Sequence, residues 1–553
     1  MQNSAESEYL FRHALMRDVA YNLHMPSERA GLHAMAAHAW QAMAQAASTE
    51  HADALATEVV FHGALASEAE PELAAAASGI EYQWLPVAAQ YHKRQFDHAA
   101  NRVCWKRRAD HPLASGADRA SALVRLAEAC IRAADKAAAL DASRQAADAA
   151  RRHAPGLVPE ALALHGSALL LIGDYPAART ALDEAARTAP HGSATHVMAS
   201  RLIGQLLVST TDPHWREATQ RAIELAREAG LADELAQARN VMAVALINFG
   251  DLREAEACAR EVVEAAASEG NQWMEAVGLL NYSLAAWQLH GVAHARPLLD
   301  RCISLARQVG HTRLLIAATF QSAQFARAQG EYGRAYETLQ ALIGQARESG
   351  SIREQQAIPD LLVPLCNTLG RAEESLAAAR HAYALSNRRD YRAHEAEAAM
   401  LLGRLDLAVE RANDLLAQRV DPAEAPRDYD QSRAICTVLL ARVCWLRDDQ
   451  KTAREKFTEA QAILDKDADP VFVRLVAWQA RTFRESCLHE EAREVVTASR
   501  TRMLRPDPWF LLEGVHATSG SQDEASWRSE LHECIARMRD HEGPELRAAL
   551  RLI

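Results

Sequence analysis

The sequence predicts an all-α chain, built as a right-handed superhelical solenoid of about eleven to twelve antiparallel helix pairs. Three observations predict this fold. Alanine fills 115 of the 553 positions, whereas the chain has only 24 glycines, 18 prolines and 6% aromatic residues, a balance that favours packed helices over sheets. A chain of 553 residues is also several times longer than an ordinary domain, so one compact core is not expected. Finally, one short motif recurs about every forty residues, which is typical of stacked repeats.

The recurring motif is a glycine, any residue, an apolar residue, two further residues and an alanine. Its clearest copies are Gly173–Ala178, Gly250–Ala255, Gly330–Ala335 and Gly403–Ala408. Weaker copies begin at 94, 134, 213, 290, 370, 448, 487 and 520, which makes twelve units with spacings of mostly 37 to 40 residues. Glycine permits a positive φ and ends a helix, so each copy predicts the tight turn inside one helix pair. The longest unit contains residues 421–428, which we predict to form a hinge.

Two columns of small residues accompany these turns. The position that closes the motif is alanine in every unit except one, where it is Ser375. The position seven residues before each start is Ala, Gly or Ser in eight of the twelve units. Antiparallel helices approach closely only where small side chains lie at their crossing. Each pair then leaves an apolar face that the next pair covers, so the pairs are expected to stack.

These units resemble the tetratricopeptide family over about residues 85 to 540, although most of them are longer than the 34 residues usual in that family. Longer repeats of this kind are similar to those attached to bacterial signalling ATPases of the MalT type. The resemblance implies a cytoplasmic bacterial protein whose first helices line a concave groove for a protein or peptide partner.

The N-terminal residues carry a second resemblance. The runs Phe11-Arg12-His13-Ala14-Leu15 and Arg17-Asp18-Val19-Ala20-Tyr21, followed by Arg29, Leu32 and His33, are similar to the end of the winged-helix module in STAND-type ATPases. This resemblance implies a helical remnant over residues 1–65, a solenoid with a C-terminal capping helix over 66–553, and a phosphate-sensing role for His13. The alternative is that His13 packs at a helix start. The phosphate-binding pattern G-x-x-x-x-G-K-[ST] does not occur, so this chain is not expected to hydrolyse nucleotide.

Composition argues against several other functions. The formal net charge of −12 gives no general attraction to nucleic acid or anionic membrane, and no apolar run reaches the roughly 18 residues of a membrane span. Nine cysteines without a C-x-x-C pair indicate reduced, buried thiols. His290 and His294 lie near Cys302 but cross a predicted turn, so no metal site is assigned. No cofactor and no catalytic residue is expected.

Candidate binding residues follow from the register of the repeats. In tetratricopeptide stacks the groove is lined by positions 13, 10, 6, 3 and 2 residues before each turn. In the central units these positions and their neighbours hold polar and aromatic residues: Gln237, Asn240, Asn248, Trp287, Gln288, Phe320, Gln324, Arg327, Asp360 and Asn367. Amides can hydrogen-bond a peptide backbone, and Trp287 with Phe320 could form an apolar anchor. The alternative, that the aromatic residues belong to the core, stays open.

A second candidate is a stripe of arginines near the C-terminal end. Arg474, Arg481 and Arg484 lie on one face of a predicted helix, and Arg442 takes the corresponding place in the preceding unit. They could bind an acidic tail or a carboxylate, or they could simply solvate a helix.

The sequence therefore favours the sensor and protein-interaction region of a bacterial signal-transduction ATPase. A stand-alone scaffold that assembles other proteins is the alternative, and a hydrolase built in the groove is a third possibility.

Overall fold

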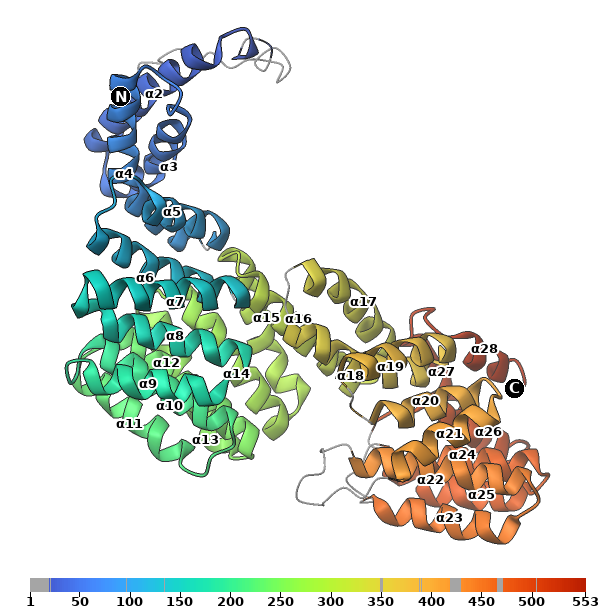
Figure 1. Cartoon of the computed structure of the whole chain (residues 1–553). Helices are drawn as coiled ribbons and strands as arrows, with labels where there is room; N and C mark the ends of the chain where they lie inside the picture. Colours follow the sequence, from blue (N-terminus) through green and yellow to red (C-terminus); the bar gives the residue numbers. More distant parts are fainter. Residues whose placement is uncertain are drawn as a thin grey trace. The chain divides into compact units, whose positions relative to one another are not determined.

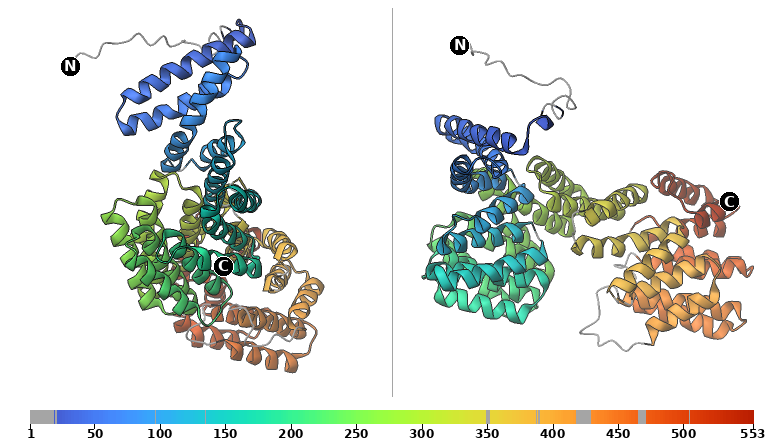
Figure 2. Two further views of the ribbon diagram at one scale, coloured as in Figure 1. Left: turned by 60° about the vertical axis from the view of Figure 1, so that its left-hand side comes forward. Right: turned by 45° about the horizontal axis from the view of Figure 1, so that its top comes forward.

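A computed structural model describes residues 19, 21–95, 97–133, 135–348, 352–386, 388, 390–417, 429–464, 471–503 and 505–553. Within these residues every regular element is a helix, which confirms the predicted all-α class (Figure 1). The chain forms two compact units (Figures 1 and 2). The first unit holds residues 1–285 and 307–311, and the second holds 286–306 and 312–553. The sequence did not predict this division.

In the first unit, consecutive helices pack side by side as pairs that stack on their neighbours. Its helices are α2 (Pro26–Ala46), α3 (Thr49–Leu65), α4 (Pro71–Arg94), α5 (His98–Asp110), α6 (Gly116–Arg132), α7 (Lys136–His153), α8 (Val158–Ile172), α9 (Tyr175–Thr188), α10 (Ala194–Ser209), α11 (Trp215–Glu228), α12 (Ala232–Phe249) and α13 (Leu252–Ser268). The unit boundary falls within α14 (Gln272–His290).

The second unit continues the same pattern. Its helices are α15 (Val292–Gln308), α16 (Thr312–Ala328), α17 (Tyr332–Glu348), α18 (Ile352–Leu369), α19 (Ala372–Ser386), α20 (Asp390–Leu401), α21 (Leu405–Leu416), α22 (Tyr429–Leu446), α23 (Gln450–Ile463), α24 (Phe472–Glu485), α25 (His489–Ser499), α26 (Pro508–Ala517), α27 (Glu524–Ala536) and α28 (Pro544–Leu550). Among the even-numbered helices, α20, α22, α24 and α26 contact one another in succession.

All twelve predicted turns fall between the two helices of a pair. The turn after α8 shows why the motif works. Gly173 takes a φ of 85°, and its N–H and that of Asp174 both donate to the carbonyl of Leu169, which closes the first helix. The Asp174 carboxylate then accepts from the N–H of Ala177 and caps the second helix. Two adjacent residues therefore end one helix and begin the next.

The closing column of small residues lies at the helix crossings. Nine of its twelve members are buried: Ala139, Ala178, Ala255, Ala295, Ala335, Ser375, Ala408, Ala453 and Ala492. Gly166, from the column before the turn, lies so close to Leu182 that an added Cβ would stand 2.5 Å from its Cγ. Close helix contact therefore depends on these small residues.

The predicted register is wrong by one or two residues in three units. Ala99, Ala218 and Ala525 are not buried, and the side chains that fill the crossings are Asn101, Thr219 and Trp527. In the last of these units Gly514 provides the space instead, because its missing Cβ would stand 2.1 Å from the Trp527 ring.

The second unit closes on itself. Its C-terminal helices return to α16–α19, and residues from both ends share one hydrophobic core that includes Tyr332, Leu369, Phe510 and Leu546 (Figure 1). Backbones meet without intervening side chains: the N–H of Gly543 donates to the carbonyl of Leu369 over 2.7 Å.

Polar contacts hold this closure from outside. Glu337 on α17 accepts from Arg539 Nη1 at 2.8 Å and contacts His541 Nε2 at 3.0 Å. Arg371 Nε donates to the carbonyl of His541 at 2.7 Å, and the Glu545 carboxylate accepts from the N–H of Ala372. The segment between α27 and α28 is thereby fixed to α17 and to the turn that precedes α19.

One helical stretch, residues 155–172, is long and apolar enough to cross a membrane by length and composition. Here α8 packs between α7 and α9 and buries Leu162, Leu164 and Leu169, so it serves as a core helix. His165, which interrupts its apolar run, lies 3.0 Å from the hydroxyl of Ser143. All nine cysteines are free thiols, and six of them are buried.

Substituting Gly543→Ala should open the closure of the second unit, because the new Cβ would lie 1.8 Å from the carbonyl oxygen of Gly370. We expect a loss of about 1–3 kcal/mol of unfolding free energy and faster proteolysis after residue 536. Gly344→Ala is the matched control: its Cβ would meet no atom within 4 Å, so this exposed helical site should be neutral or gain stability. Equal stability of both variants in chemical denaturation would contradict the proposed tight contact.

Candidate functional site

The second unit contains a cavity of about 190 Å³. Five successive first helices, α16, α18, α20, α22 and α24, contribute to its wall, together with the segments that precede α20 and α26. The lining residues are Arg327, Asp360, Pro364, Thr368, Arg388, Asp390, Tyr391, His394, Glu397, Gln431, Ser432, Ile435, Val471, Arg474, Arg505 and Asp507. Four arginines and four carboxylates make this a charged, nearly balanced surface.

The inner wall is built around Arg474, which is only 7% exposed. Its Nε lies 3.5 Å from Glu397 Oε1 and 3.4 Å from Asp507 Oδ2, and its Nη2 donates to Thr368 Oγ1 at 3.1 Å. Glu397 also accepts from the indole of Trp478. A buried charge is tolerated only when such partners surround it.

The outer wall is held by Arg388. Its Nη1 donates to both oxygens of Asp360, at 2.7 and 2.9 Å, and its Nη2 donates to Asp390 at 2.6 Å. The Tyr391 hydroxyl donates to Asp360 as well. Burial and then this hydrogen bond raise the pKa of Tyr391 well above its usual range, so the phenol stays neutral.

Half of the residues that line the cavity lie at positions that the repeat register predicts to face inward. Arg327, Asp360, Pro364, Thr368, Asp390, Glu397, Ile435 and Arg474 all lie at the positions predicted to face inward before their turns. The register missed Tyr391 and His394, which lie between those positions, and Gln431, Ser432 and Val471, which precede the first such position of their units. It also missed Arg388, Arg505 and Asp507, which lie outside helices and carry no periodic signal.

The amide residues predicted for the groove have three different environments. Asn240 on α12 is half-buried and accepts from Asn281 of α14 at 2.7 Å, whereas Asn248 is exposed. Asn367 on α18 is fully buried, and its Nδ2 donates to Glu397 at 3.1 Å behind the cavity wall. Gln288 is exposed and Gln324 is half-buried.

The aromatic residues predicted as an anchor take part in packing. Trp287 is half-buried against Phe325, with ring centroids 5.2 Å apart, and Phe325 is fully buried. Phe320 packs against the main core of the second unit. This placement favours the open alternative that aromatic side chains at helical spacing belong to the core.

The predicted arginine stripe is paired with carboxylates of its own chain. Arg442 and Arg481 both bind Glu485, and Arg484 donates to the two oxygens of Glu513 at 2.7 and 2.9 Å. Although burial alone would raise the pKa of Glu485, the two arginines hold it below its usual value. An acidic ligand for Arg442, Arg481 and Arg484 stays a prediction, and such a ligand would have to compete with these internal partners.

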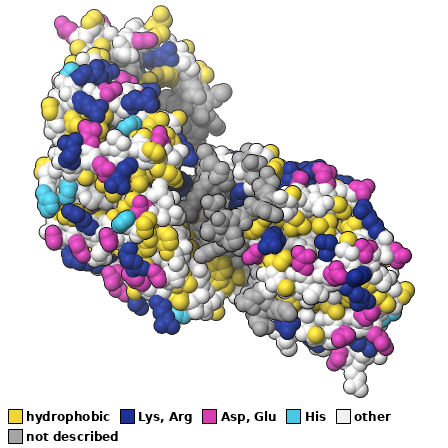
Figure 3. All heavy atoms as spheres, turned by 60° about the horizontal axis from the view of Figure 1, so that its bottom comes forward, with side chains coloured by type: hydrophobic (Ala, Val, Ile, Leu, Met, Phe, Trp, Pro, Cys, Tyr) yellow, Lys and Arg dark blue, Asp and Glu magenta, His cyan; other side chains and the backbone are white. Residues whose placement is uncertain are grey.

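In the first unit, ion pairs join successive first helices. Lys93 of α4 binds Glu128 of α6 at 2.9 Å, and Arg201 of α10 binds Glu234 of α12 at 2.8 Å. Burial would raise the pKa of Glu128, but Arg132, Lys93 and Arg125 outweigh it and lower this pKa to about 2. Figure 3 shows acidic and basic side chains interspersed on the face it draws.

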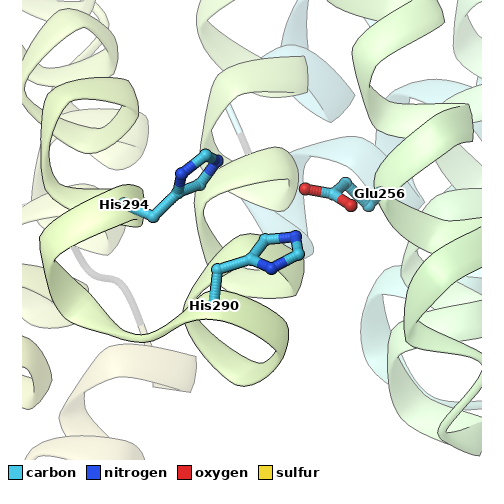
Figure 4. Close-up of side chains that lie close together, drawn as sticks. All are labelled: Glu256, His290 and His294. Carbon is cyan, nitrogen blue, oxygen red and sulfur yellow. The ribbon is translucent and has the colours of Figure 1, made fainter.

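His13, the predicted hinge and the His290–His294 pair are the remaining features that the sequence singled out. His13 and residues 421–428 lie outside the described residues. His290 and His294 face each other across the turn between α14 and α15, with ring centroids 4.9 Å apart (Figure 4). Glu256, also drawn in Figure 4, belongs to α13 of the first unit.

No family model and no curated protein match the chain. Among solved structures it is similar to a Rap protein complexed with competence and sporulation factor, at 14% identity and a TM-score of 0.42 over 57% of this chain and 98% of that one. It is also similar to the APC/C hetero-tetramer Cut9–Hcn1, at 13% identity and a TM-score of 0.29, over 85% of this chain and 96% of that one.

A third similar structure is a signal transduction ATPase with numerous domains that carries a tetratricopeptide repeat sensor, from Pyrococcus horikoshii. Identity is 11% and the TM-score 0.34, over 80% of this chain and 55% of that one. At these values none of the three structures assigns a family or a ligand to this chain.

His516 on α26 makes the second unit sensitive to mild acid. Burial, followed by repulsion from Arg484, Arg528 and Arg481, lowers the pKa of His516 to about 4. The folded state therefore resists a proton that the unfolded chain takes up below about pH 6.5, so stability is full above that pH and falls as the pH drops toward 4. His516→Gln should remove about 1 kcal/mol of the stability difference between pH 7 and pH 5, measured by denaturant titration. An identical pH dependence in both proteins would contradict this assignment.

Proposed function

We propose that the chain is a non-catalytic interaction scaffold that binds a protein or peptide along the inward face of its first helices. The observation that carries the proposal is the convergence of five successive first helices on one polar cavity, with half of the lining residues at the predicted register positions. Stacked helix pairs create extended surfaces of this kind, on which a polypeptide can contact several repeats at once.

The chemistry of the cavity suits a polypeptide better than a reaction. Arginines, carboxylates, a glutamine and hydroxyls alternate along the wall and offer both donors and acceptors, as a peptide backbone requires. The acids of the wall are engaged in ion pairs or caps. Burial raises the pKa of Cys302 to about 12 and of Cys534 to about 12, which keeps these thiols protonated and unreactive.

Within this function we favour the sensor region of a bacterial signal-transduction ATPase. The support is the resemblance of Phe11–Leu15 and Arg17–Tyr21 to the end of a winged-helix module. A stand-alone scaffold is the alternative. In the sensor scheme, a partner that binds one conformation better would shift the conformational equilibrium of a switch domain. His13 would contact the nucleotide phosphate.

A random-peptide display selection on the full chain tests the scaffold proposal. Selected peptides should bind with measurable affinity, and the double variant Arg327→Ala, Gln431→Ala should weaken that binding about tenfold or more through lost hydrogen bonds. The control is Lys451→Ala, Glu459→Ala on α23, which changes exposed side chains outside the cavity. Peptides that bind all three proteins equally would remove the inward face as the binding surface.

A further inference from the structure

The cavity wall contains a buried arginine whose donors are mostly unused. Arg474 is 7% exposed, and among the described residues it makes one hydrogen bond, from Nη2 to Thr368. Glu397 and Asp507 approach Nε only as ion-pair neighbours at 3.5 and 3.4 Å. None of the Arg474 nitrogens is both sealed from solvent and without a partner among the described residues, and Arg474 lines the cavity.

A second unused group lines the same cavity. Ser432 on α22 is 3% exposed, yet within the described part of the chain its hydroxyl has no hydrogen-bond partner. A hydroxyl in the middle of a protein normally finds a partner, because leaving it unpaired costs about 1–3 kcal/mol. Because Ser432 lines the cavity and its hydroxyl is not sealed from solvent, this hydroxyl can donate to a molecule that enters there.

A further charged group without an opposite charge in the described part of the cavity wall is also positive. Arg505, in the segment before α26, lines the cavity without a carboxylate partner among the described residues. Helix α24 also begins there, since Val471, which directly precedes this helix, lines the wall.

The acids of the wall are already engaged. Asp360 and Asp390 share Arg388, and Asp507 accepts from the N–H groups of Trp509 and Phe510 as the cap of α26. The wall therefore has hydrogen-bond donors without partners among the described residues, whereas its carboxylates are already paired. Such a wall favours a ligand that brings acceptor oxygens and negative charge. The 190 Å³ volume lies below the about 300–1,000 Å³ of drug-sized pockets, so a molecule held inside the cavity itself is small.

We propose that this cavity binds a small organic anion through a carboxylate or phosphate group, held by Arg474, Ser432 and Arg505. This ligand belongs to a different class from the polypeptide partner. The proposal of an anion site does not depend on whether the inward face binds a polypeptide. Asp507 and Arg505 come from the segment before α26, so the site is complete only when α26 is in place.

Equilibrium dialysis of the full chain against radiolabelled inorganic phosphate and against radiolabelled succinate tests this site. One of the two anions should bind saturably at about one per chain, and the one that binds identifies the group. Arg505→Ala and Ser432→Ala should each weaken binding about tenfold or more. These substitutions leave the ion pairs of Arg474 and Arg388 intact, so both proteins should keep the helical content and melting temperature of the parent.

The matched controls are Arg447→Ala, an exposed arginine outside the cavity, and Ser519→Ala, an exposed serine. Both should bind like the parent protein. The proposal is overturned if neither anion binds saturably, if binding survives in both cavity variants, or if Arg447→Ala weakens it as much as Arg505→Ala does.

Discussion

The structure depends on one constraint: no helix pair in this chain can bury its own apolar face, so every pair must lie close against the next. Close approach in turn requires small residues at the crossings. Gly166 against Leu182 and the buried column from Ala139 to Ala492 meet this requirement. The high alanine content is therefore a packing property of the solenoid, since a larger side chain at any crossing would separate two backbones.

The same stacking determines the chemistry of the interior. When successive first helices line one cavity, their inward polar residues meet, and burial obliges them to pair. Arg442 of α22 with Glu485 of α24, and Arg484 of α24 with Glu513 of α26, are results of this pressure. Arg474 is the exception, because its two acidic neighbours do not use its full set of donors. An incompletely paired cation beside a cavity distinguishes a binding surface from a purely structural network.

Much of the fold could be predicted from local sequence. The turns were predicted correctly because glycine and aspartate act on the residues beside them, as Gly173 and Asp174 do. Half of the cavity-lining residues lie at the inward register positions, because those positions follow helical spacing. The pairing of Arg442 and Arg484 could not be predicted, since Glu485 and Glu513 reach them only after helices pack. Arg505 lies in an irregular segment, where periodicity carries no information.

The return of the C-terminal helices has a consequence for how the second unit forms. In an open array each repeat touches only its neighbours, and folding can spread from any point. Here Arg537 contacts Gln329 across 208 residues, and His541 contacts Glu337 across 204. Such contacts raise the contact order and slow the search for the native state. During synthesis, α16–α19 emerge long before the segment that completes them, so the second unit finishes folding only when α27 and α28 have left the ribosome.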